Sequence, residues 1–143
     1  MTDDTALRKI LGDGHIGVLA TIKRDGRPQL TNVAHLYDAA SETILISITE
    51  SRAKTKNLRR DPRAVFHVTA KDGWSFAAAE CTAELTEVAK DPHDDTVEAL
   101  VDLYRAVKGE HPDWDEYRTA MVADGRLVVR LRVESTYGQL PGR

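Results

Sequence analysis

The sequence contains a single cysteine, Cys81, and lacks any apolar run that approaches the length of a membrane span. One cysteine cannot form an intrachain disulfide, so nothing indicates an oxidising compartment. A membrane helix needs roughly 18 or more apolar residues, and the acidic start Met1–Asp4 lacks the basic residues of a signal peptide. We therefore expect a cytoplasmic protein that is neither exported nor inserted into a membrane.

An excess of positive charge is also missing, since 20 Lys and Arg residues stand against 23 Asp and Glu and give a net charge of −3. Binding to a nucleic-acid backbone needs a broad basic surface. We therefore expect no nucleic-acid partner, and any anion site must be local. The 143 residues contain no internal repeat or low-complexity tract, which predicts one globular domain over residues 1–143.

Motifs for metal binding and nucleophilic catalysis are absent as well. The five histidines lack the i, i+4 spacing of a zinc-binding helix. No Gly-x-Ser-x-Gly turn occurs, and Cys81 lies in a predicted strand without an identifiable base. We expect no metal site and no catalytic nucleophile.

Hydrophobic periodicity, turn residues and caps predict the order of the elements. Strands are predicted over residues 15–23, 28–37, 42–49, 63–70, 74–88 and 126–133, and helices over residues 3–12, 52–60, 95–108 and 113–123. Ser51 is expected to cap the second helix, and Asp95 with Glu98 has capping-box spacing in the third. This order predicts a mainly β fold with flanking helices, in which a small barrel closes the sheet edges.

Positive charge is concentrated in residues 51–63, where six of the chain's 20 basic residues occur. A helix N-terminus offers free amides and a partial positive charge to an anion, and Arg52 and Lys54 lie in the first turn. The segment therefore suits a phosphate group. The alternative is a solvated basic helix face, because Arg52, Lys56 and Arg59 fall on one side of the predicted helix.

Four segments carry a family resemblance in their order and spacing: Ile16–Thr21, Asp25–Gln29, Arg52–Arg63 and Asp72–Trp74. Together they resemble the pyridoxamine 5'-phosphate oxidase-like FMN-binding split barrels, and among these the actinobacterial branch that uses coenzyme F420. The similarity runs over nearly the whole chain. It implies a split β-barrel of about six mostly antiparallel strands with an inserted helix pair, a homodimer, and a flavin or deazaflavin coenzyme bound at the dimer interface.

The resemblance also implies the residues that hold the coenzyme. The residues matching the family's phosphate site are Arg52, Lys54 and Asn57, with Lys56 assisting at the anionic tail. The residues expected along the ring are Leu19, Ala20, Thr21, Pro28, Gln29, Thr31 and Asn32. Trp74 is expected to come from the partner chain and to lie beside the ring or the substrate, the alternative being an aromatic side chain packed in the core.

His35 and Tyr37 share one face of their predicted strand, so we expect them in the substrate pocket. A histidine packed inside the barrel is the alternative interpretation for His35.

The activity implied is hydride transfer between coenzyme F420 and a conjugated small molecule such as an enone, a quinone or a tetrapyrrole. The C-terminal segment Ser135–Arg143 lacks the substrate motif of the vitamin-oxidising members, which argues against pyridoxine phosphate oxidation. The basic excess suits the multiply charged tail of F420, whereas FMN ends at one phosphate. Two alternatives stay open: an FMN-dependent oxidase-like enzyme, and a non-catalytic F420 carrier or sensor.

Overall fold

Seven strands form one sheet in the computed structural model, which describes residues 3–142, so Met1, Thr2 and Arg143 lie outside the described part. The strands are β1 (Ile16–Ile22), β2 (Pro28–Ala34), β3 (Leu36–Asp38), β4 (Thr43–Thr49), β5 (Arg63–Thr69), β6 (Phe76–Leu85) and β7 (Arg126–Gln139). Their order is β2-β1-β5-β6-β7-β4-β3, and every pairing among them is antiparallel. The predicted mainly β, antiparallel fold is confirmed.

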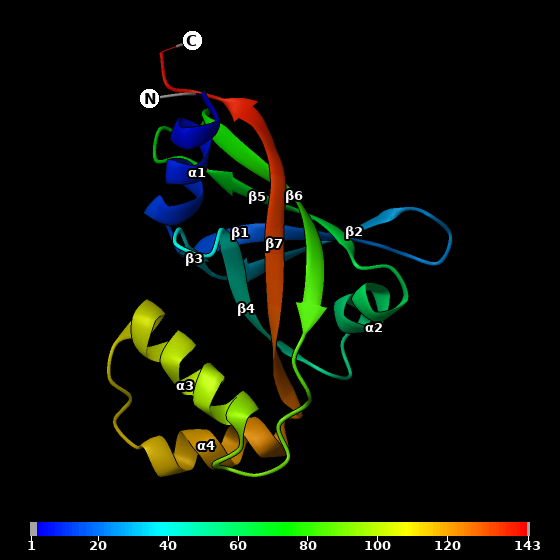
Figure 1. Ribbon diagram of the computed structural model, residues 1–143, viewed down its shortest axis with the longest axis vertical. Helices are drawn as coiled ribbons and strands as arrows, with labels where there is room; N and C mark the ends of the chain where they lie inside the picture. The colour runs from blue at the N-terminus through cyan, green and yellow to red at the C-terminus, as the bar shows by residue number, and fades with distance from the viewer. Residues whose placement is uncertain (1–2, 143) are drawn as a thin grey trace.

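Four helices flank this sheet: α1 (Asp3–Asp13), α2 (Ala53–Arg60), α3 (Asp95–Lys108) and α4 (Trp114–Ala123). Helix α2 connects β4 to β5, and the pair α3–α4 is inserted between β6 and β7, as the sequence predicts. In Figure 1 the helix pair lies at one end of the molecule and α1 at the other, with α2 at the side beside the β1–β2 hairpin. Among residues 3–142, no helix has the length and apolar content that a membrane crossing requires.

The sheet curls into a half-barrel because its two edge strands, β2 and β3, are consecutive in the chain and separated by His35 alone. The sequence predicts one strand over residues 28–37, and this prediction is wrong at His35. There the backbone N–H of His35 donates to the carbonyl of His15, 2.8 Å away, while the chain passes from one edge of the sheet to the other. The inside of the curl is filled by fully buried side chains such as Leu19 and Phe66.

Two helix caps differ from the sequence prediction. Asp94, and not Asp95, caps α3, since its carboxylate accepts from the backbone N–H of Val97 at 2.8 Å and also from the backbone N–H groups of Lys90 and Asp91. These extra bonds fix the preceding loop, and the helix itself covers residues 95–108 as predicted. The Ser51 cap is also wrong, because α2 has its N-cap at Arg52, without a side chain that accepts from the first turn.

The closing strand β7 is longer than predicted, since it continues beyond Val133 to Gln139. Its last five residues pair with the first half of β6, after a β-bulge between Glu80 and Cys81 that leaves Glu134 without a partner in the register. A bulge increases the local twist, which suits a curled sheet. Strand β6 begins at Phe76, two residues after its predicted start.

Candidate functional site

Helix α2 is fixed against the sheet by the side-chain amide of Asn57, which is 7% exposed. Its Nδ2 donates to Thr21 Oγ1 on β1 at 3.1 Å and to Gln29 Oε1 on β2 at 2.9 Å. Its Oδ1 accepts from Arg60 at 3.0 Å. The structure thus brings together three residues of the predicted coenzyme site, but they bind one another. Asn57 positions the basic helix and has its own polar atoms engaged.

The N-terminal turn of α2 is electropositive. Arg52 is exposed and Lys54 is half-buried beside it. Burial lowers the pKa of Lys54, and the nearby positive charges of Arg52 and Arg126 lower it further. The positive end of the helix dipole lies at the same place. An anion bound here would relieve the repulsion among these groups.

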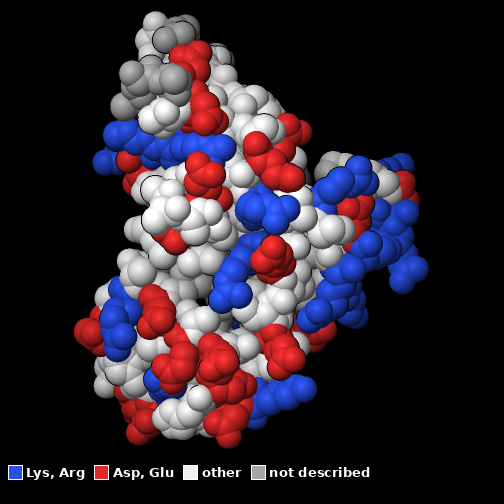
Figure 2. All heavy atoms as spheres, viewed as in Figure 1, with Lys and Arg blue, Asp and Glu red and all other residues white. Residues whose placement is uncertain are grey.

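A groove between the β1–β2 hairpin and α2, called here the hairpin groove, has a volume of about 320 Å³. It is lined by Lys23, Arg24, Gln29, Ala53, Lys56, Asn57 and Arg60. Four of these residues are basic and none is acidic. Arg60 is held in place by a second bond, from its Nη2 to the carbonyl of Ile22 at 2.9 Å. Figure 2 shows Lys and Arg side chains gathered over this side of the molecule.

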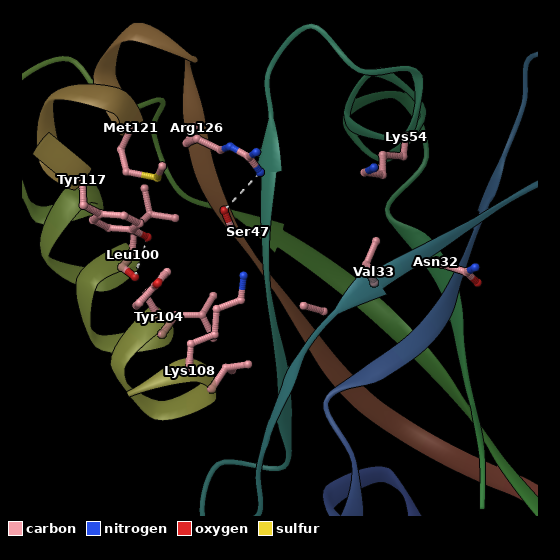
Figure 3. A pocket seen from close by; sticks show the side chains of 13 residues that line it. Asn32, Val33, Ser47, Lys54, Leu100, Tyr104, Lys108, Tyr117, Met121 and Arg126 are labelled. Carbon is pink, nitrogen blue, oxygen red and sulfur yellow. Dashed lines mark hydrogen bonds between the residues drawn. The ribbon is translucent and has the colours of Figure 1, made fainter. Parts of the chain in front are cut away.

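A larger cleft of about 430 Å³, called here the helix-pair cleft, lies between α3–α4 and the sheet (Figure 3). It is lined by Asn32, Val33, Ala34, Ser47, Lys54, Leu100, Leu103, Tyr104, Val107, Lys108, Tyr117, Met121 and Arg126. Of the predicted coenzyme residues, the cleft contains Lys54 and Asn32, while Lys56 faces the hairpin groove. The predicted site is therefore divided between the two sides of α2.

The predicted ring contacts alternate between the two faces of the sheet. Leu19 is fully buried inside the curl, and Thr31 is its partner in the register, so it lies on the same inner face. Ala20 and Pro28 line a hollow on the outer face, where a third cleft of about 410 Å³ crosses β1, β5 and β6. One flat ring cannot contact side chains on both faces of the sheet. A ligand on the outer face would therefore meet only the backbone of Leu19.

The outer face also carries exposed apolar side chains. Ile16 and Leu30 are each 65% exposed and Tyr137 is 52% exposed. The register places Tyr137 in one row with Val18 and Asn32 across β7, β6, β5, β1 and β2. Large apolar side chains exposed on one face of a small domain are typical of a surface that another molecule covers.

The residues expected around the substrate are not gathered at one place. His35 is fully buried, its Nε2 donates to the carbonyl of Leu11 at 2.8 Å, and burial lowers its pKa. This placement favours the alternative of a packed barrel histidine. Tyr37 is half-buried against the core near α1, and it lines neither the hairpin groove nor the helix-pair cleft. Trp74 is 75% exposed in the β5–β6 turn, which rules out the core aromatic.

Several basic residues of the two clefts were missed from the sequence. Lys108 lies in the last turn of α3 and Arg126 begins β7, far from the basic segment in the chain. Lys23 and Arg24 are ordinary turn residues without a motif, whereas Arg60 belongs to the basic segment 51–63 that is visible in the sequence. Only the folded sheet brings Lys23, Arg24, Lys108 and Arg126 to the two clefts, so no local pattern could have indicated their roles. Within residues 3–142 no group of His, Cys, Asp and Glu side chains is arranged to hold a metal ion.

Comparisons with known proteins find a matching family model and solved structures with a similar fold. A family model described as pyridoxamine 5'-phosphate oxidase matches residues 4–139. The fold is similar to that of an F420 reductase, with a TM-score of 0.69 and 22% identity over 91% of this chain and 94% of that one. A conserved hypothetical protein from Mycobacterium tuberculosis matches with a TM-score of 0.71 and 22% identity, over 100% and 91% of the two chains. A putative pyridoxamine 5'-phosphate oxidase from Listeria innocua matches with a TM-score of 0.66 and 17% identity, over 94% and 96%.

Proposed function

Because the chain belongs to the pyridoxamine 5'-phosphate oxidase family, we propose that it binds coenzyme F420 and transfers hydride between this deazaflavin and a conjugated small molecule. The observation that carries the proposal is the cationic lining on both sides of α2, in which no acidic residue takes part. Arg52 and Lys54 hold the phosphate at the N-terminus of the helix, where free backbone amides add donors.

The hairpin groove is the reason to prefer F420 to FMN. Its cations Lys23, Arg24, Lys56 and Arg60 continue beyond the N-terminal turn of α2. FMN has a single phosphate and leaves these residues without a ligand. The phospholactate and glutamate tail of F420 carries several negative charges, which match a row of basic side chains. The residues present therefore fit the larger, more anionic coenzyme.

The ring is proposed to lie at the outer sheet face, in the interface of a homodimer. The exposed side chains of Ile16, Leu30 and Tyr137 support a second copy of the chain on this face. The partner's Trp74 would then lie beside the ring. Leu30→Glu is expected to give a monomer in sedimentation analysis, because a buried unpaired charge opposes the interface; a monomeric wild-type protein at micromolar concentration would contradict the dimer.

The coenzyme supplies the hydride chemistry when bound, so the chain needs no nucleophile. Its residues hold the anionic groups, orient the acceptor against the ring and exclude water. Cys81 does not serve as a nucleophile, because its side chain is buried and burial raises the pKa of the thiol to about 12. In this proposal the protein binds and orients the coenzyme and the acceptor in its two cationic clefts, and the coenzyme carries out the chemistry.

Parallel fluorescence-quenching titrations with oxidised F420 and with FMN test the proposal. We expect a micromolar or tighter Kd for F420 and binding of FMN that is weaker by about tenfold or more, the scale of one lost charge-assisted contact. A preference for FMN would assign the other coenzyme. Binding of neither molecule would refute the phosphate site on α2. If F420 binds, turnover with an enone or quinone acceptor would identify an enzyme, and its absence would identify a carrier.

A further inference from the structure

The helix-pair cleft holds three cations without a counter-charge. None of the ion pairs among residues 3–142 includes Lys54, Lys108 or Arg126. The ammonium group of Lys108 lies 5.5 Å from the centre of the Tyr104 ring, in a cation–π contact that leaves its hydrogen-bond donors available. The cleft therefore has an unsatisfied preference for an anion.

Arg126 has donor capacity that the protein does not use. Its Nη1 lies 3.4 Å from Ser47 Oγ, a long contact, and its Nε is buried without a hydrogen-bond partner. A buried unsatisfied donor costs free energy, and a planar guanidinium with free donors matches a carboxylate. Figure 3 shows this group reaching from β7 to the edge of β4 beside Ser47, with Lys54 beyond β4 in the same view, and the positive charge of Arg126 is near enough to lower the pKa of Lys54.

The opposite wall of the cleft is apolar. It consists of side chains of α3 and α4, among them Leu100, Leu103, Tyr104 and Met121. Tyr117 contributes its ring, because its hydroxyl already donates to the carbonyl of Leu100 at 3.0 Å. A ligand that satisfies both walls has an apolar body and an anionic group.

We propose that the helix-pair cleft binds a molecule with a flat apolar body and a carboxylate, and that Lys108 and Arg126 hold this carboxylate. Its volume of about 430 Å³ lies in the range of small-molecule sites. We assign the ligand as the acceptor substrate and not as the coenzyme tail, since a polar tail gains nothing from the apolar wall. This last step rests on the proposed function, whereas binding of the acid does not.

Titration with fluorescent 1-pyrenebutyrate and its neutral analogue 1-pyrenebutanol tests the site on the full chain without coenzyme. Wild-type protein is expected to bind the acid about tenfold tighter than the alcohol, the discrimination expected of a charge-assisted hydrogen bond. Lys108→Met and Arg126→Met should each remove most of this preference and leave the alcohol's Kd unchanged. Lys90→Met is the matched control, because Lys90 is exposed and lines neither cleft.

Three outcomes would overturn the proposal. The first is equal affinity of the wild-type protein for acid and alcohol, and the second is an unchanged preference in Lys108→Met, whose exposed position tolerates the substitution. The third is a loss of F420 affinity in Lys108→Met with pyrenebutyrate binding intact, which would assign the cleft to the coenzyme tail. Failure to bind any coenzyme would refute only the proposed function, because the pyrene titrations are read without it.

Discussion

Replacement of Asn57 by Ala tests whether its amide positions α2 or contacts the coenzyme directly. The substitution removes two donated hydrogen bonds, at 3.1 and 2.9 Å, and one accepted from Arg60. Each such bond contributes about 1 kcal/mol, and Thr21 Oγ1, in a side chain that is 1% exposed, also loses a partner. We expect the free energy of unfolding to fall by roughly 2–3 kcal/mol.

Urea denaturation at pH 7, followed by tryptophan fluorescence, measures this loss. Lys56→Ala is the control, because the side chain is exposed on the same helix and its removal should change stability by less than about 0.5 kcal/mol. Stability of Asn57→Ala within about 0.5 kcal/mol of wild type would refute the positioning role. If coenzyme affinity fell sharply at the same time, Asn57 would be a direct ligand instead.

Two further predictions concern the core. A Cβ on Gly17 would clash with the Phe66 ring and lie 2.9 Å from the His67 carbonyl, so Gly17→Ala should lower the melting temperature, whereas Gly14→Ala, with open space around it, should not. Burial raises the pKa of Cys81 to about 12. The thiol therefore stays protonated in the folded protein at pH values where it ionises in the unfolded chain. Its contribution to stability is complete below the ordinary thiol pKa of 9.0 and is lost as pH rises toward 12. Urea unfolding between pH 8.5 and 10 should therefore show a steeper loss for wild type than for Cys81→Ala; equal slopes would contradict the shift.

Local patterns predicted most of the elements. The alternation in residues 16–22 and 43–49 and the helical period of residues 95–108 follow from the burial of one face. The break at His35 was not predictable, because it depends on the joining of the two sheet edges. The bounds of α3 were predicted as observed, but the cap was assigned to Asp95 and not Asp94, since the two are equally good caps until the bonds from Lys90 and Asp91 are known.

The candidate site was predictable only in part. The basic segment containing Lys54 and Lys56 is visible in the sequence, but its division by α2 between two clefts is a property of the packed helix. Asn57 matches the family's phosphate site by position, yet in this chain its amide is bound to β1 and β2. Arg126 joins Lys54 only because β7 crosses the sheet beside β4. Such long-range neighbours have no local sequence signal.

The most direct test of the phosphate site on α2 is the Kd of oxidised F420 for the wild-type protein and for Lys54→Ala, with Lys90→Ala as the control. The half-buried ammonium of Lys54 lies at the N-terminal turn of α2 without an ion pair among residues 3–142. We predict weaker binding of Lys54→Ala by about 1.5–3 kcal/mol, roughly 10- to 150-fold in Kd, the scale of one charge-assisted hydrogen bond. A Kd of Lys54→Ala equal to that of the wild-type protein would contradict the account.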